Sequence, residues 1–139
     1  MKTEKEKIID GEPYPLGDLD LKKDRRKAKN VLHRLNVTEY RITKNARLSL
    51  EELLPNPGNN LYIAPPVFCD YGYNISCGDN VFFNVNCVVL DENKVTIGSH
   101  VLFGPGVQLY TASHPLESQM RRTHKVSKPI TIGNDCWIG

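Results

Sequence analysis

The sequence contains no apolar run that approaches the roughly 20 residues needed to cross a membrane as a helix. Its first ten residues, MKTEKEKIID, are charged and lack the apolar core of a signal peptide. We therefore expect a cytoplasmic protein with no membrane partner. At 139 residues, the chain has the length of one domain, possibly with a small appendage.

An excess of one charge is also absent, because the formal net charge is only +2. The densest basic cluster, KKDRRKAK at residues 22–29, lies on an expected helix and includes an acid. Such a cluster is either a solvated helix face or a patch for nucleic acid or a membrane surface. We favour the solvated face and expect no nucleic-acid partner.

The four cysteines, Cys69, Cys77, Cys87 and Cys136, form no CxxC pair. This spacing argues against a zinc ribbon. A chain without an export signal stays in a reducing compartment, where disulfides rarely persist. We expect the cysteines to be small core residues rather than catalytic thiols, because apolar burial raises the pKa of a thiol and leaves it inert.

Residues 1–58 have a helical pattern. Between residues 20 and 36, apolar side chains follow one stripe at helical spacing, formed by Leu21, Ala28, Val31, Leu32 and Leu35. A second helical segment, SLEELL, carries Ser49 and Glu52 at capping-box spacing. The breaker cluster PNPGNN follows at residues 55–60. We therefore divide the chain into a helical segment, 1–58, and a second region, 59–139.

The second region repeats every six residues. An apolar residue opens each six, glycine often follows it, and a smaller residue takes the fifth place. A six-residue period predicts a parallel β-helix in which three sixes form one triangular coil. The first residues point inward and stack between coils, while glycine supplies backbone freedom at the turns. We expect these side chains to face inward: Ile63, Phe83, Val89, Ile97, Phe103, Leu109, Ile132 and Ile138.

The alternative for this region is an antiparallel β-sandwich with glycine turns. Its turn signals recur every 8 to 12 residues rather than every six, so we favour the coil. The fold class is therefore all-β dominated, with an N-terminal helical segment. The repeat stops within LYTASHPLESQ, and we expect an extruded loop at about 115–131 before the pattern resumes.

Four segments together resemble one known family. They are EKEKIIDGEPY, CDYGYNISCGDNVFFNVNCVVLD, YTASHP and KPITIGNDCWIG. The chain resembles the maltose and galactoside O-acetyltransferases, the sugar branch of the hexapeptide-repeat acetyltransferases. This resemblance implies a left-handed parallel β-helix and a homotrimer with sites between subunits. It also implies transfer of an acetyl group from acetyl-CoA to a sugar hydroxyl, of the maltose or glucose type, without a metal.

The resemblance gives His114 the role of catalytic base. The residue stands where the repeat stops, so a rigid wall holds it at a cleft. A sugar hydroxyl is a poor nucleophile, and an imidazole suits the removal of its proton. A structural turn histidine is the alternative. A zinc site with His100 and His124 is a further alternative, which we do not favour because His100 lies at a turn position within a six.

The resemblance carries further residues over one at a time. The predicted sugar contacts are Asp18, Arg25, Asp70, Asp91 and Glu92. Asn84 and Trp137 match residues that line the acetyl-CoA site. For each of the four acids, a solvated turn position is the alternative interpretation.

The sequence ends at DCWIG, where the resembling enzymes continue with further coils that contact coenzyme A. We therefore expect a C-terminally truncated form or the N-terminal part of such an enzyme. Two alternatives stay open. One is a non-catalytic remnant that trimerises or binds sugar, and the other is an acetyltransferase for an antibiotic or another hydroxyl compound.

Overall fold

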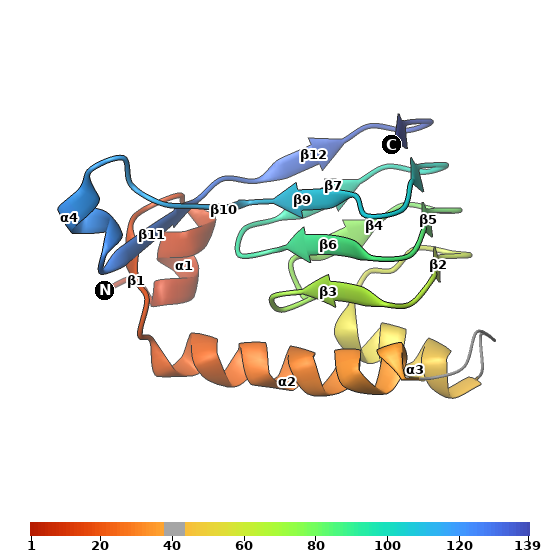
Figure 1. Cartoon of the computed structure of the whole chain (residues 1–139), viewed down its shortest axis with the longest axis horizontal. Coiled ribbons are helices and arrows are strands. Elements are labelled where there is room, and N and C mark those ends of the chain that lie inside the picture. The colour runs from red at the N-terminus through yellow and green to blue at the C-terminus, as the bar shows by residue number, and fades with distance from the viewer. Residues whose placement is uncertain (38–43) are drawn as a thin grey trace.

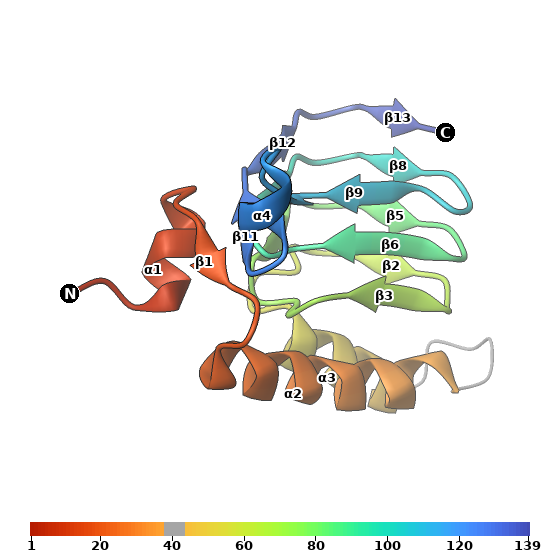
Figure 2. The ribbon, with the colours of Figure 1, turned by 60° about the vertical axis from the view of Figure 1, so that its left-hand side comes forward.

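The computed structural model describes residues 1–37 and 44–139, which form a coil of short strands resting on a layer of helices (Figure 1). Helices α2 (Leu19–Asn36) and α3 (Lys44–Leu53) lie side by side across the end at which the coil begins (Figure 2). The short helix α1 (Glu4–Ile9) stands beside the coil. Within the described ranges, no helix has the length and apolar character needed to span a bilayer.

Helix α2 begins at Asp18, whose side chain accepts a hydrogen bond from the Leu21 amide at 2.9 Å. A carboxylate at this position satisfies one of the free amides of the first turn. The predicted apolar stripe is confirmed, because its members are the buried residues of α2: Leu21, Ala28, Val31, Leu32 and Leu35. Together with α3, most of this stripe packs against the first coil.

The predicted capping box at Ser49 and Glu52 is wrong. Helix α3 already includes Lys44, so Ser49 lies inside the helix and is buried. Its buried neighbours Ala46, Leu50 and Leu53 share helical spacing and pack into the core. This apolar face keeps the segment upstream of Ser49 helical, so the capping-box spacing marks no helix start.

Ten strands build the coil and fall into three parallel sheets. One sheet contains β2 (Tyr62–Ile63), β5 (Phe82–Phe83), β8 (Leu102–Phe103) and β13 (Trp137–Ile138). The second contains β3 (Val67–Cys69), β6 (Cys87–Leu90) and β9 (Gln108–Tyr110). The third contains β4 (Ile75–Cys77), β7 (Val95–Ile97) and β12 (Ile130–Ile132). The chain visits the three sheets in turn, which makes a three-sided parallel coil as the six-residue period predicts.

The interior of the coil consists of apolar side chains stacked in register. Ile63 pairs with Phe83, Phe83 with Phe103, and Phe103 with Ile138. The rings of Phe83 and Phe103 stack with centroids 4.3 Å apart. Five of the eight predicted inward residues are fully buried, and the other three, Leu109, Ile132 and Ile138, are partly buried against the same core. The last three lie on strands at the edge of their sheets.

Glycine directly after the apolar residue that opens a six serves a different purpose from the one expected at Gly78 and Gly98. A Cβ atom on Gly78 would lie 2.5 Å from the Ser99 side chain, and one on Gly98 would lie 2.4 Å from that of Asn134. Space between coils, rather than backbone freedom, therefore selects glycine at these two places. Left-handed backbone at these corners falls on the residues Asn60, Asn80, His100 and Asp135, with φ of 56–58°, while Gly72 and Gly106, elsewhere in the sixes, also have positive φ.

The segment after the repeat stops is an ordered excursion. It contains β10 (Ala112–Ser113), α4 (Ser118–Arg121) and β11 (His124–Ser127). Strand β11 pairs antiparallel with β10 on one side and with β1 (Tyr14–Pro15) on the other. The chain rejoins the coil at Ile130, inside the predicted loop of 115–131. The N-terminal segment thus contributes a strand as well as helices.

Candidate active site

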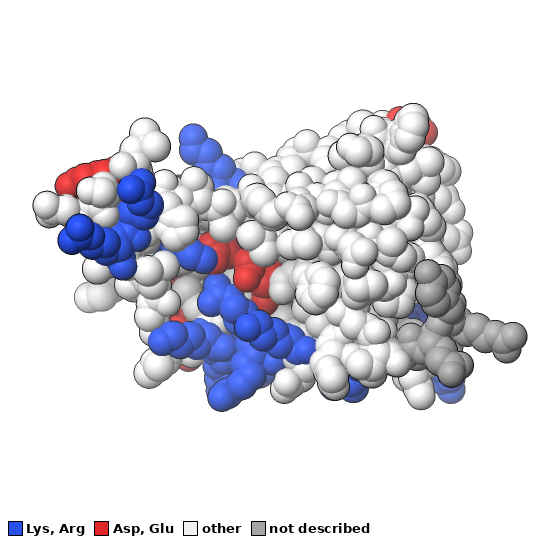
Figure 3. All heavy atoms as spheres, in the orientation of Figure 1, with Lys and Arg blue, Asp and Glu red and all other residues white. Residues whose placement is uncertain are grey.

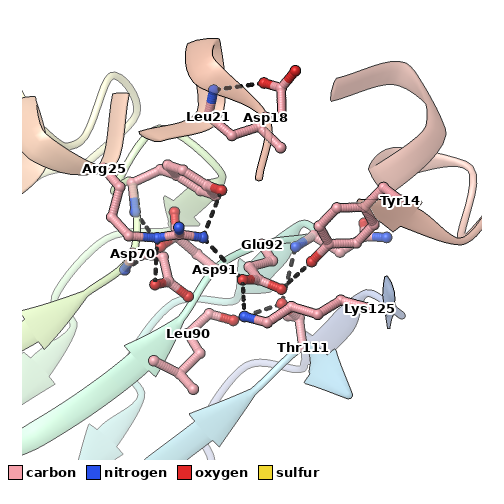
Figure 4. A network of polar contacts seen from close by, with 12 residues as sticks. Tyr14, Asp18, Leu21, Arg25, Asp70, Leu90, Asp91, Glu92, Thr111 and Lys125 are labelled. Carbon is pink, nitrogen blue, oxygen red and sulfur yellow. Dashed lines mark hydrogen bonds and ion pairs between the residues drawn. The ribbon is translucent and has the colours of Figure 1, made fainter. Parts of the chain in front are cut away.

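A cluster of charged side chains lies where the N-terminal segment, the coil and the excursion meet (Figure 4). Its centre is Glu92, whose side chain is 0% exposed. Its Oε1 accepts hydrogen bonds from Arg25 Nη2 at 3.1 Å and from Lys125 Nζ at 2.7 Å. The hydroxyl of Tyr14 donates to Oε2. Both carboxylate oxygens are therefore occupied by donors from three separate segments.

Arg25 connects this centre to the solvent. Its Nε donates to Asp70 Oδ1 at 3.2 Å, and its Nη2 donates to the hydroxyl of Tyr71 at 2.9 Å. The side chains of Arg25 and Asp70 are 27% and 17% exposed. Burial opposes the guanidinium charge, but Tyr71, Asp70 and Glu92 together raise the pKa of Arg25. Figure 3 shows acidic atoms in a hollow between basic side chains over α2 and around α4.

Burial also raises the pKa of Asp70, and the neighbouring Glu92 adds to the effect, while Arg25 and Lys125 act against it. A partly exposed carboxylate and a guanidinium held side by side offer an acceptor and a donor to the same ligand. This pair is suited to a polyhydroxyl ligand, because each hydroxyl both donates and accepts.

Asp91 fixes the turn that carries Asp70. Its Oδ1 accepts the backbone amides of Asp70 and Tyr71 at 3.0 and 2.9 Å, and its Oδ2 accepts that of Asn74 at 3.3 Å. Burial raises the pKa of Asp91 to about 6, although these amide bonds oppose the shift. The solvated-turn alternative is wrong for Asp91 and Glu92, since both are buried. Their sugar contact stays a prediction, and their burial favours an indirect role.

Asp18 has a structural partner at the start of α2, where it accepts the Leu21 amide. In Figure 4, no interaction joins Asp18 to the cluster around Glu92. The predicted sugar contact of Asp18 stays a prediction, and the residue acts here as a helix cap.

His114 is exposed and follows directly after β10. Strand β10 pairs with β11, with Ser113 opposite Val126, and β11 carries Lys125 of the cluster. The histidine is thus anchored by a sheet at its N-terminal side and is free to reach solvent. An exposed imidazole is accessible to a substrate hydroxyl, and the role of His114 as general base stays a prediction.

Asn84 and Trp137 lie away from His114 within one chain. Asn84 follows β5, at the corner that leads into the β3-β6-β9 sheet, whereas His114 follows the opposite end of that sheet (Figure 1). Trp137 lies on β13 with 80% of its surface exposed. The Asn84 side chain accepts its neighbour's amide, that of Val85, at 2.8 Å. The chain alone does not bring these residues to the histidine.

No role was predicted from the sequence for three members of the cluster: Tyr14, Tyr71 and Lys125. Tyr14 and Lys125 are 78 and 33 residues away from Glu92, and both belong to irregular segments without a repeat. Periodicity carries no information about such contacts. Only the antiparallel pairing of β1 with β11 brings them to one carboxylate.

The other histidines lie elsewhere. His100 occupies a corner of the coil with left-handed backbone, and His124 Nδ1 lies 2.8 Å from the Thr123 hydroxyl. Across residues 1–37 and 44–139 of a single chain, no group of three His, Cys, Asp or Glu side chains is placed to hold a metal ion.

The cysteines match the expected packing role. All four are free; Cys77 and Cys87 are buried, and Cys69 and Cys136 pack partly buried against the core. Burial raises the pKa of Cys77 to about 12 and also raises that of Cys69. Thiols in this state are weak nucleophiles.

A scan against protein-family models found no match. Nodulation protein L of Rhizobium meliloti is 41% identical over 139 residues, which cover 99% of this chain and 76% of that protein. Among solved structures, a maltose O-acetyltransferase from Clostridium difficile 630 has a TM-score of 0.96 at 37% identity, covering 99% of this chain and 74% of that one.

A galactoside acetyltransferase in complex with coenzyme A has a TM-score of 0.92 at 30% identity. Its match covers 99% of this chain and 69% of that one. The matches to these relatives extend over nearly the whole chain and include the six-residue repeat. The chain therefore belongs to the family of the maltose and galactoside O-acetyltransferases, which are hexapeptide-repeat acetyltransferases.

Proposed function

We propose that the protein transfers the acetyl group of acetyl-CoA to a hydroxyl of a glucosyl sugar such as maltose or glucose. The observation that carries this proposal is the likeness to the maltose O-acetyltransferase, at 37% identity over 99% of this chain. The solved galactoside acetyltransferase binds coenzyme A, which supports acetyl-CoA as the donor here. The partly exposed pair of Arg25 and Asp70 supports a polyhydroxyl acceptor.

His114 acts as the base in this proposal. The sugar hydroxyl attacks the thioester carbonyl carbon while its proton passes to the imidazole. The tetrahedral intermediate then releases the coenzyme A thiolate, which takes the proton from the imidazolium. The products are an acetyl ester and free coenzyme A, so no acyl-enzyme is required.

The acceptor would contact the two partly exposed members of the cluster, Arg25 and Asp70. Asp91 holds the Asp70 turn, and Glu92 holds Arg25. Asp18 belongs to the proposed acceptor region through its place at the start of α2. Asn84 and Trp137 would line the acetyl-CoA site.

A homotrimer completes the site in this proposal, because Asn84 and Trp137 of one subunit must meet His114 of another. The outer faces of the coil support this. The β2-β5-β8-β13 sheet presents Phe82, Leu102 and Trp137 in register, with Leu102 49% and Trp137 80% exposed. The β4-β7-β12 sheet presents Ser76, Thr96 and Thr131. The apolar face formed by Phe82, Leu102 and Trp137 is suited to a subunit interface.

The proposal also includes the left-handed sense of the coil that the family resemblance implies. It divides the chain into a helical segment, 1–58, and the coil, 59–139. A cytoplasmic location fits the four free cysteines, because a reducing compartment keeps thiols unpaired.

The test is a thiol-release assay with acetyl-CoA and a panel of acceptors. We expect turnover with maltose or glucose in the wild type and its loss in His114→Ala. Turnover with only antibiotics or other non-sugar hydroxyl compounds would overturn the choice of acceptor. No turnover with any acceptor, combined with sugar binding or a stable trimer, would favour a non-catalytic remnant.

A further inference from the structure

The part of the excursion that follows His114 has few buried side chains. From His114 to Val126 no residue is fully buried, and Leu116 is 97% exposed. A segment without buried apolar side chains gains little stability from the hydrophobic effect. Its position must therefore come from the sheet and from polar contacts of β11.

The polar contacts of β11 converge on one side of the strand. Lys125 donates to the buried Glu92, and Ser127, two residues later and on the same side, donates to the Ile8 carbonyl at 3.0 Å. The side chain of Asn93 donates to the same carbonyl at 2.7 Å and to the Ser127 hydroxyl at 3.2 Å. The strand is thus fastened to the coil and to α1 at two successive positions.

Tyr14 lies directly opposite Lys125 in the antiparallel pairing of β1 and β11. Opposite residues present their side chains on the same face, and here both side chains reach Glu92. Tyr14 is 2% exposed, and its hydroxyl bond to the carboxylate joins the N-terminal segment to the same centre. Strand β10, which ends one residue before His114, is the next strand in this sheet.

We propose that Tyr14, Glu92 and Lys125 are positioning residues that hold the β1-β11-β10 sheet, and with it His114, in one place against the coil. The proposal rests on the function proposed above. Glu92 is the buried anion to which Lys125 and Tyr14 fasten strands β11 and β1. The same carboxylate holds Arg25, so the base and the acceptor contact take their positions from one group.

An incomplete network around Glu92 would carry an electrostatic cost. A buried carboxylate is stable only when charges and hydrogen bonds compensate it. Without the Lys125 ammonium, Glu92 still has Arg25 and Tyr14, so the coil stays folded while β11 loses one of its two side-chain fastenings. Without the Glu92 charge, Arg25 and Lys125 would face each other as like charges, which disturbs both the excursion and the acceptor contact.

Lys125→Met is the variant that separates these effects, because it removes the ammonium and keeps an apolar stem of similar length. Lys128→Met is the matched control, since Lys128 is exposed and lies close by in the same excursion. We expect Lys125→Met to lower kcat by about 10- to 100-fold, as misplaced catalytic groups do. The KM for acetyl-CoA and the melting temperature are expected to match those of Lys128→Met. Lys125→Arg keeps the charge and is expected to restore most of the rate.

Hydrogen exchange of the amides from residue 112 to 127 supplies a readout besides activity. We expect faster exchange there in Lys125→Met and Tyr14→Phe, with the coil unchanged. A Lys125→Met variant that matches Lys128→Met in exchange overturns the proposal, and faster exchange with unchanged kcat overturns the positioning role. If the wild type shows no turnover, the proposed function fails, and exchange alone decides whether these residues fasten the sheet.

Discussion

The coil and the cluster around Glu92 differ in how far apart in sequence their partners lie. In the coil, each side chain meets its equivalent one turn away, as Asn59 meets Asp79 at a separation of 20 residues. In the cluster, Glu92 meets partners 33, 67 and 78 residues away. The coil is held by stacked apolar side chains, whereas the cluster is held by charges and hydrogen bonds. The apolar core of the coil and the polar contacts of the proposed site are thus located in different parts of one small chain.

The comparison predicts that His114 matters for rate and not for stability. We expect His114→Ala to lower kcat by about 10²- to 10⁴-fold, the usual contribution of general acid–base catalysis. The free energy of unfolding is expected to change by only about 0.5 kcal/mol, because the residue is exposed. Steady-state kinetics and urea denaturation of the same samples check this. A variant that unfolds would show that the break in the repeat is structural.

The opposite behaviour is expected in the coil. Phe103 is 1% exposed and stacks on Phe83, so Phe103→Ala removes a ring from the interior. We expect a loss of about 3–5 kcal/mol in the free energy of unfolding. Thr96→Ala on the exposed face of β7 is the control, with an expected change of about 0.5 kcal/mol or less. Equal losses for both variants in urea denaturation would contradict the account of the core.

Asp91 sharpens the comparison, because it is a buried charge that belongs to the coil. Burial raises its pKa to about 6, whereas an aspartate in an unfolded chain titrates near pH 4. Between these values the folded chain holds a proton that the unfolded chain releases. The contribution of Asp91 to the free energy of unfolding therefore decreases as the pH rises through this window.

Asp91→Asn removes this titration. We expect the stability of the wild type relative to the variant to decrease by about 1–3 kcal/mol between pH 4 and pH 7. Urea denaturation at several pH values measures the difference between the two proteins. A difference that stays constant or grows with pH would show that the amide bonds to Asp91 outweigh its burial.

The smallest expected effect concerns the corners of the coil. His100 has a left-handed backbone at a place where the neighbouring turns carry Asn80 and Asp135. Asparagine adopts this conformation more readily, so His100→Asn is expected to stabilise the chain by about 0.5 kcal/mol. His33→Asn, on the exposed face of α2, is the control and is expected to give no gain. Thermal melts of both variants decide the point, and a loss of stability in His100→Asn would assign the histidine a role beyond the turn.

Much of the fold follows from the sequence, because its signals are periodic. The apolar stripe of α2 and the sixes of the coil both repeat on the scale of their own backbone geometry. The predicted helix start at Ser49 was wrong, because a capping pattern is short and occurs inside helices by chance. The buried apolar face of α3 begins upstream of Ser49, at Ala46. The predicted reason for glycine was also wrong at Gly78 and Gly98, because contact between coils is not a property of one turn.

The amino-acid sequence alone specifies the coil, because equivalent positions recur every turn and bury their apolar side chains only by stacking on each other. It also singled out His114, where the repeat stops. The folded chain was needed to show that Tyr14 and Lys125 lie opposite each other on two short strands and meet at Glu92. These contacts join irregular segments once each, so no period in the sequence records them.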